Sequence, residues 1–274
     1  MGVSISILTV VTCFYNIGRE NIDGRSEALY LHWLEETIKL FPNIVIFHNQ
    51  AFSDPSLKFP KTVKTIHFPF NEFWVSEYRE LIERICNSNL GHSSDITFRL
   101  PQYAMLQLSK FEFLSQAQKI SDSKSLLWVD AGISRFVGKH SISQPESIAK
   151  RLLQEGYDSC FELDLGHNID LRKRRIKNPA VGTNKKVIGG GSFWISSEVS
   201  ADLNCLVRQE IKNWLANSLW DNEQIMLRNL AKKWTFKSKY LASFRGGTAS
   251  VARYFLGSGI SNLPFDRLWT RMLK

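Results

Sequence analysis

The chain has 274 residues, enough for one large domain or two small ones with a sizeable core. Hydrophobic residues make up 43% and aromatic residues 12% of it, which excludes a disordered chain and predicts a folded globule. The formal net charge of +9 favours an anionic partner: nucleic acid, a phosphate-bearing ligand or an acidic membrane surface.

The cysteines and the apolar runs bear on the compartment. Cys13, Cys86, Cys160 and Cys205 are far apart and form no C-x-x-C pair, so they predict reduced thiols and not a disulfide framework or a structural zinc site. The apolar run Ser4–Val11 is too short to span a bilayer, no basic segment precedes it, and no later run reaches spanning length. We therefore expect a cytoplasmic protein.

The first half of the chain alternates strand and helix patterns, which predicts a mostly parallel sheet with right-handed crossovers. β-Branched residues predict a first strand over residues 4–14, and Ser26 is a suitable cap for a helix over 27–40 that Pro42 ends. The pattern then predicts strands over 43–47 and 63–68, helices over 71–90 and 100–120, and a buried strand over 126–130.

The second half continues this alternation in one α/β domain over residues 1–274. It predicts helices over 145–155, 198–215 and 221–232, and strands over 158–163 and 187–195. The polar segment 166–184 contains the basic run Arg172–Lys177 and is expected to be a mobile loop. Residues 260–274 end in a basic amphipathic pattern, which fits either a helix lying on an anionic membrane or a terminal helix docked on the core.

A carboxylate ends a short apolar run that is predicted to be a buried strand. The run Leu126–Val129 stops at Asp130, and Gly132 comes two residues later. Open α/β sheets bind their ligands at the carboxyl ends of their strands, so Asp130 is placed to hold a divalent cation through a hard oxygen ligand. The alternative is that Asp130 only starts a turn, because Asp and Gly are frequent turn residues.

Two arginines lie in the polar loop after the first predicted strand. The guanidinium groups of Arg19 and Arg25 match the geometry of phosphate oxygens, so this pair can bind a diphosphate. The alternative is that both are ordinary surface arginines.

A second acidic stretch, Trp220–Gln224, is expected to open a helix. Asp221 or Glu223 can act there as a general base on a hydroxyl nucleophile, beside the aromatic Trp220. The alternative is that both acids only favour a helix N-terminus, with Asp221 as the N-cap and Gln224 closing a capping box.

Three glycines, Gly189–Gly191, interrupt the strand predicted over 187–195. They allow a ligand to approach the backbone closely, or a bulge that re-aims Phe193 and Trp194. An exposed tryptophan beside a carboxylate cleft can stack on a sugar ring, whereas the alternative makes Phe193 and Trp194 ordinary core residues. The candidates for binding a saccharide acceptor are Gly190, Gly191, Trp194 and Trp220.

Three stretches together resemble the bacterial HtrL/YibB family: Thr12–Arg19 with Arg25–Ser26 and Tyr30, then Trp128–Ile133, then Gly189–Trp194. That family is similar to nucleotide-sugar glycosyltransferases of the GT-A fold, and similar proteins are encoded with genes for lipopolysaccharide, lipooligosaccharide and capsule. The resemblance covers most of the chain from Ser4 to about Trp234. It implies a GT-A-like, Rossmann-like domain and a hexosyltransferase that moves a sugar from a nucleotide sugar, in the first place a UDP-sugar, to a saccharide or lipid-linked saccharide.

The resemblance also implies roles for particular residues. Asp130 would occupy the place of the metal-binding D-x-D motif, where Mn²⁺ or Mg²⁺ holds the donor diphosphate, and Gly132 stands where that motif has its second carboxylate. Glu223 and Asp221 would be the catalytic candidates, with inverting and retaining chemistry both open. The donor-binding candidates are Thr12, Phe14, Tyr15, Asn16, Arg19, Arg25, Asp130 and Gly132.

Two other functions stay open. A nucleotidyltransferase that activates a sugar phosphate should carry a glycine-rich, lysine-containing loop after its first strand, and Thr12–Gly18 has neither feature. A non-catalytic protein that binds nucleic acid or a membrane surface would use the +9 charge, but apart from Arg172–Lys177 the basic residues are scattered. We therefore expect no nucleic-acid partner, and peripheral association with the inner face of the cytoplasmic membrane as one setting for a lipid-linked acceptor.

Overall fold

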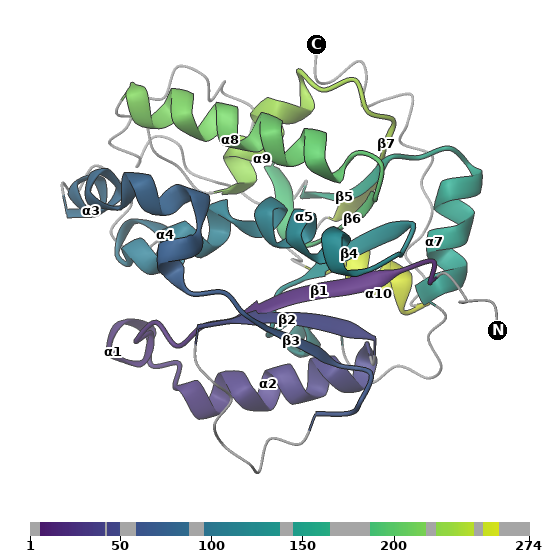
Figure 1. The fold of residues 1–274 in the computed structure, drawn as a ribbon, viewed down its shortest axis with the longest axis horizontal. Coiled ribbons are helices and arrows are strands. Elements are labelled where there is room, and N and C mark those ends of the chain that lie inside the picture. The colour runs from purple at the N-terminus through teal and green to yellow at the C-terminus, as the bar shows by residue number, and fades with distance from the viewer. Residues whose placement is uncertain are drawn as a thin grey trace.

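The computed structural model describes residues 6–41, 43–49, 59–87, 96–137, 145–164, 187–217, 223–243 and 249–257. Its frame is one seven-stranded sheet in the order β3-β2-β1-β4-β6-β5-β7 (Figure 1). The strands are β1 (Thr9–Phe14), β2 (Ile44–His48), β3 (Lys64–His67), β4 (Ser125–Val129), β5 (Ser159–Asp164), β6 (Val187–Ser196) and β7 (Ser238–Ser243). Within this sheet β6 runs antiparallel to β4 and β5, and the other neighbouring strands are parallel. The predicted α/β fold with one mostly parallel sheet is therefore confirmed.

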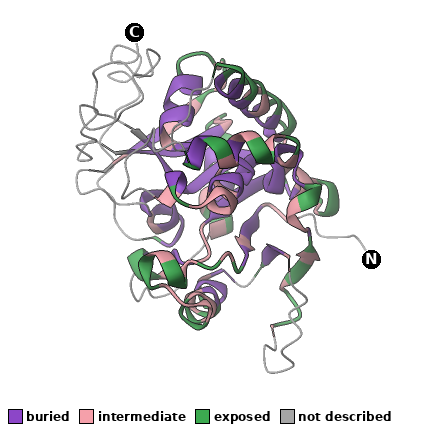
Figure 2. Cartoon of the chain, turned by 90° about the vertical axis from the view of Figure 1, so that its left-hand side faces the viewer, coloured by how far each residue is buried: buried purple, intermediate pink, exposed green. Residues whose placement is uncertain are grey.

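Helices cover both faces of the sheet (Figure 1). One face carries α3 (Arg79–Asn87), α4 (Pro101–Leu108), α5 (Lys110–Ile120), α8 (Ser200–Ala216) and α9 (Glu223–Ala231). The other face carries α2 (Glu27–Leu40), α6 (Ser134–Val137), α7 (Pro145–Gln154) and α10 (Ser250–Phe255). Figure 2 shows the buried strands between these helices, whose outer sides are exposed.

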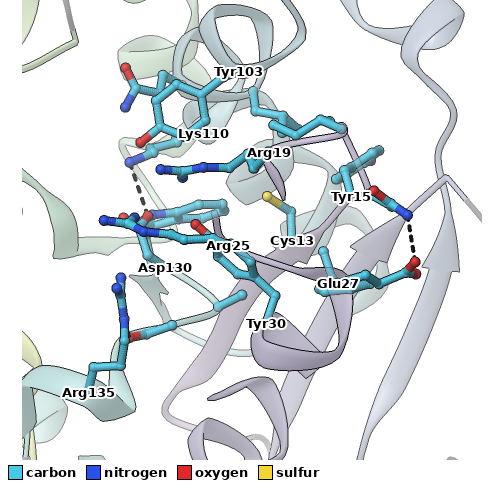
Figure 3. Close-up of a pocket in the computed structure, with 18 residues that line it drawn as sticks. Cys13, Tyr15, Arg19, Arg25, Glu27, Tyr30, Tyr103, Lys110, Asp130 and Arg135 are labelled. Atoms are coloured by element: carbon cyan, nitrogen blue, oxygen red, sulfur yellow. Dashed lines mark hydrogen bonds and ion pairs between the residues drawn. The ribbon is translucent and has the colours of Figure 1, made fainter. Parts of the chain in front are cut away.

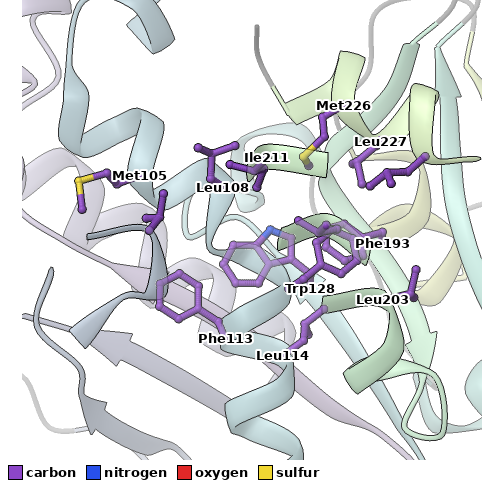
Figure 4. Close-up of a cluster of buried hydrophobic side chains, with 14 of the residues drawn as sticks. Met105, Leu108, Phe113, Leu114, Trp128, Phe193, Leu203, Ile211, Met226 and Leu227 are labelled. Atoms are coloured by element: carbon purple, nitrogen blue, oxygen red, sulfur yellow. The ribbon is translucent and has the colours of Figure 1, made fainter. Parts of the chain in front are cut away.

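The sheet separates two hydrophobic cores, and β4 contributes to both. Successive side chains of a strand point to opposite faces, so Leu126 and Trp128 pack into the first core and Leu127 and Val129 into the second. This arrangement explains why the strand reads as a continuous apolar run. In the first core Trp128 stacks on Phe113, with ring centroids 5.9 Å apart and ring planes 10° apart (Figure 4).

Two predicted helices differ from the structure in the same region. The helix expected over 100–120 is broken at Ser109, whose φ of −96° and ψ of 3° leave the helical range, so α4 and α5 are separate. The helix expected over 71–90 is α-helical only from Arg79. Before that residue the chain forms two 3₁₀ turns (Phe70–Glu72 and Trp74–Tyr78), because Phe73 between them is extended and buried among aromatic rings.

The pattern missed some short elements. The loop after β1 contains the four-residue helix α1 (Glu20–Asp23), and α6, β7 and α10 were not predicted.

Several predicted features lie outside the described residues. They are the basic loop around Arg172–Lys177, the pair Trp220 and Asp221, and the amphipathic segment 260–274. Across the ranges that the structure does describe, no helix combines the length and the apolar character needed to cross a bilayer.

Candidate functional site

A pocket of about 890 Å³, counting its open mouth, lies at the carboxyl ends of β1 and β4. These two strands are neighbours in the sheet, and the chain leaves them toward opposite sides, because β2 and β3 lie beyond β1 while β6 lies beyond β4. Such a switch in strand order opens a crevice at the carboxyl edge of an α/β sheet. The pocket is therefore where the fold itself places a ligand site.

Most of the predicted donor-binding residues line this pocket (Figure 3). Thr12 does not, because its side chain is completely buried within β1. The candidates that meet at the pocket are Phe14, Tyr15, Asn16, Arg19, Arg25, Asp130 and Gly132.

Three guanidinium groups gather around Asp130. Figure 3 shows the ends of Arg19, Arg25 and Arg135 on the same side of the pocket as that carboxylate. Burial lowers the pKa of Arg135, and the nearby charge of Arg25 lowers it further. This mutual repulsion means that a bound anion would stabilise all three side chains.

Aromatic rings and one acid hold these arginines in place. Arg19 lies between two tyrosines, with its Cζ atom 4.8 Å from the ring centroid of Tyr103 and 5.5 Å from that of Tyr30. It also pairs with Asp23, whose carboxylate lies 3.6 Å from Arg25 Nε. Arg19 and Arg25 are thus held by contacts within the protein that need no ligand.

A buried lysine, Lys110, lines the pocket beside Asp130. Lys110 is 5% exposed, and its Nζ atom lies 3.1 Å from Asp130 Oδ1 and 3.3 Å from Glu223 Oε1. The same atom donates a hydrogen bond of 2.8 Å to the carbonyl oxygen of Gly190. An ammonium group has three hydrogens to donate, so these three acceptors use all of them.

The protonation of this cluster follows from its burial. Burial alone would lower the pKa of Lys110, but Asp130 and Glu223 raise it above its ordinary value, so the lysine is charged. Burial raises the pKa of Glu223, and Lys110 opposes that shift. Tyr103 also has a raised pKa, because it is buried and faces both carboxylates, so its hydroxyl keeps its proton.

The side chain of Asp130 is fixed from a second direction by Trp128. The indole Nε1 donates a 2.9 Å hydrogen bond to Asp130 Oδ1, the oxygen that also contacts Lys110. The backbone nitrogen of Asp130 donates to the carbonyl oxygen of Gly191 at 2.9 Å. Asp130 therefore presents its other oxygen, Oδ2, to the pocket, with 46% of the side chain exposed.

Glu223 and the predicted acceptor residues lie elsewhere. Glu223 is the first residue of α9, is 5% exposed and sits behind Lys110, so it does not line the pocket. Gly190 packs against it: a Cβ atom at Gly190 would lie 2.4 Å from Glu223 Oε1. Gly190 thus allows the carboxylate of Glu223, and not a ligand, to approach the backbone closely. The carbonyl oxygen of Gly191 accepts the hydrogen bond from the backbone nitrogen of Asp130.

Trp194 is fully buried in the second core, so no face of its indole is available to a sugar. The alternative interpretation, in which Phe193 and Trp194 are core residues on opposite faces of β6, is the one that fits the structure. Trp220 and Asp221 lie outside the described residues.

The sequence interpretation missed most of the helical wall of the pocket. The residues of that wall are three or four positions apart, as neighbours on one helix face are, and this face continues from α4 into α5 across the break. They are Tyr103, Leu106, Gln107 and Lys110. A lysine within the apolar stripe of a helix was the available signal, because a lysine in that position is buried and must have partners. Arg135 carried no comparable signal.

The donor atoms at Asp130 fit a divalent cation poorly. Mn²⁺ and Mg²⁺ prefer several hard oxygen ligands, and the D-x-D pattern would supply two carboxylates where this chain has Asp130 and Gly132. One oxygen of Asp130 is already engaged by an ammonium and an indole. In the described part of the chain, no group of three or more His, Cys, Asp or Glu side chains is arranged to hold a metal ion.

Comparison with known proteins gives structural likenesses at low sequence identity. No protein-family model and no curated protein matches the sequence. Core-mannan synthase A from Aspergillus fumigatus, solved in a Mn/GDP form, superposes with a TM-score of 0.49 and 7% identity over 86% of this chain and 72% of that one. A CMP:2-keto-3-deoxy-manno-octonic acid synthetase complexed with CTP gives a TM-score of 0.42 and 10% identity over 97% and 100% of the two chains.

The bifunctional IspDF from Campylobacter jejuni also gives a TM-score of 0.42 and 10% identity, over 87% of this chain. This chain spans half of that protein's length. Likenesses at this level do not assign a reaction to this chain.

Proposed function

We propose that this chain is a glycosyltransferase that transfers a sugar from a nucleotide sugar to a saccharide acceptor. The observation that carries the proposal is the pocket at the carboxyl ends of β1 and β4, where three arginines surround one fixed carboxylate. The arginines suit a diphosphate, because guanidinium groups pair with phosphate oxygens in a bidentate manner. The resemblance to the HtrL/YibB family supports the choice of glycosyl transfer.

The reaction assigns a separate task to each part of the pocket. Arg19, Arg25 and Arg135 would bind the donor diphosphate and stabilise the charge that develops on it as it leaves. The segment 13–17 after β1 would border the nucleoside. An acceptor hydroxyl attacks the anomeric carbon, the bond from that carbon to the diphosphate breaks, and a base takes the hydroxyl proton.

The two predicted catalytic acids, Asp221 and Glu223, have different roles in this proposal. Asp221 stays a predicted base for the acceptor hydroxyl. Glu223 would act through Lys110, which it helps to hold beside Asp130, because its buried carboxylate does not line the pocket. The Mn²⁺ or Mg²⁺ predicted at Asp130 would meet a single carboxylate there, already engaged by an ammonium and an indole, so the proposed steps rely on the arginines alone.

The acceptor follows only from the resemblance, which implies lipopolysaccharide, lipooligosaccharide or capsule synthesis. A lipid-linked saccharide would bring the protein to the inner face of the cytoplasmic membrane. Against nucleotidyl transfer stands the loop after β1, which contributes Asn16, Ile17 and Arg19 to the pocket and no lysine.

A thermal-shift panel of UDP-, GDP-, CMP- and dTDP-sugars tests the donor site. A ligand that binds only the folded state raises the melting temperature by mass action. We expect one nucleotide to raise it, and Arg25→Gln and Arg135→Gln each to weaken that binding about tenfold or more, as loss of a charged hydrogen bond costs about 1.5–3 kcal/mol.

Arg84→Gln is the matched control, because Arg84 is exposed on α3 and does not line the pocket. It should leave binding unchanged. If no nucleotide shifts the melting temperature, or if Arg84→Gln weakens binding as much as the pocket variants do, the assignment of the donor site is wrong.

A further inference from the structure

We infer that the ammonium group of Lys110 stands in for a divalent cation beside Asp130, so that this site binds its nucleotide diphosphate without a metal ion. The inference deepens the proposed function and rests on it for the identity of the ligand. The claim about Lys110 itself rests on contacts within the chain.

The first step is the position of the charge. Lys110 Nζ lies 3.1 Å from Asp130 Oδ1, and it is held there by Glu223 Oε1 at 3.3 Å and the Gly190 carbonyl oxygen at 2.8 Å. A metal ion bound to the same Asp130 oxygen would sit about 2.0–2.6 Å from it, on an oxygen that already contacts the ammonium group and accepts from the indole of Trp128. The two cations cannot share this oxygen without strong repulsion.

The second step is the rigidity of the arrangement. Lys110 is 5% exposed, its three hydrogens are all donated, and the ring of Trp128 lies 5.7 Å from its Nζ atom. Gly190 is a glycine where any Cβ atom would collide with Glu223, so the backbone of β6 leaves room for the carboxylate that holds the lysine. A lysine in such surroundings does not swing away to admit a metal.

The third step is the balance of charge in the pocket. Two carboxylates near a diphosphate would repel it, and the single positive charge of Lys110 offsets one of their two negative charges. The phosphate charge itself then falls to Arg19, Arg25 and Arg135, which need no metal to bind phosphate oxygens. The absence of a second carboxylate at Gly132 fits this division of work.

Removing the lysine should therefore create a metal site. Asp130 Oδ1 and Glu223 Oε1 contact the same nitrogen atom, so Lys110→Met leaves two carboxylates facing one cation-sized space. We expect the free wild-type chain not to take up Mn²⁺ at this site. We expect Lys110→Met to bind Mn²⁺, seen as loss of the electron paramagnetic resonance signal of free Mn²⁺ and as a rise in melting temperature with added Mn²⁺. Lys110→Met/Asp130→Asn is the matched control and should lose both effects.

The second arm uses the wild-type chain with the nucleotide found in the thermal-shift panel. The shift in melting temperature should be the same in EDTA and in millimolar Mn²⁺. A shift that appears only with Mn²⁺ would overturn the inference, and so would a folded Lys110→Met chain that gains nothing from Mn²⁺. The EDTA arm decides the question if Lys110→Met does not fold.

Failure of the proposed function is seen separately. If no nucleotide binds in either buffer, the glycosyltransferase proposal fails, while the Mn²⁺ titration of Lys110→Met still tests whether Lys110 occupies a cation position.

Discussion

Glu223 illustrates how burial redefines the role of a residue that the sequence singles out. Its place at the start of a helix and its acidity suggested a base open to a substrate. In the structure its carboxylate is enclosed by β6 and α5, and its Oε1 atom contacts Lys110. Its influence on a ligand is therefore transmitted through Lys110 and Asp130.

This packing makes Gly190→Ala a costly substitution. The new Cβ atom would lie 2.4 Å from Glu223 Oε1 and 2.9 Å from its Cγ, and the carboxylate cannot retreat because it is buried and bonded to Lys110. Overpacking of this kind costs about 1–3 kcal/mol of unfolding free energy, measurable by urea denaturation.

Gly189→Ala is the graded control, since its Cβ atom would come no closer than 3.1 Å to Glu162. It should cost less than Gly190→Ala. Equal effects at the two positions would show that the contact with Glu223 does not explain the glycine at 190.

At the scale of elements, regular patterns were predictable where one face or both faces of an element are buried. The helix α2 begins at Glu27 and ends at Leu40 as predicted, because Ser26 caps it and its stripe packs on the sheet. The break between α4 and α5 was not predictable, because the apolar spacing continues through Ser109 and only the packing of the two helices shows the interruption.

The Ser26 cap gives a direct test of this element. The Oγ atom of Ser26 accepts a hydrogen bond of 3.3 Å from the backbone nitrogen of Leu29. Ser26→Ala should lower the unfolding free energy by about 0.5–2 kcal/mol. Ser26→Gly should lower it by only a few tenths of a kcal/mol, because glycine suits the N-cap backbone. If circular dichroism and urea denaturation show the two variants to be equally stable, the hydroxyl does not cap α2.

At the scale of the whole molecule, strand order limited what the sequence could reveal. The parallel pairing of the first strands was readable, and it placed Asp130 and the loop after β1 at one edge of the sheet. Lys110 and Arg135 reach the same pocket from α5 and α6, and that meeting depends on long-range packing that no local pattern contains. The strand β7 was missed because it is an edge strand whose apolar run is confined to Tyr240, Leu241 and Ala242.

The net charge of +9 is also a property of the whole molecule. It predicted an anionic ligand without naming one, and a ligand of the proposed site would have to meet three guanidinium groups beside the carboxylate of Asp130.

The measurement that tests the central claim most directly is the identity of the product released from a nucleotide sugar. The wild-type chain, incubated in EDTA with the nucleotide sugar that stabilises it and with a saccharide acceptor, should release the nucleoside diphosphate and glycosylate the acceptor, both detected by mass spectrometry. Arg135→Gln should slow this release and Arg84→Gln should not. Formation of a nucleoside triphosphate when pyrophosphate is supplied, with no glycosylated product, would contradict glycosyl transfer and assign the pocket to nucleotidyl transfer.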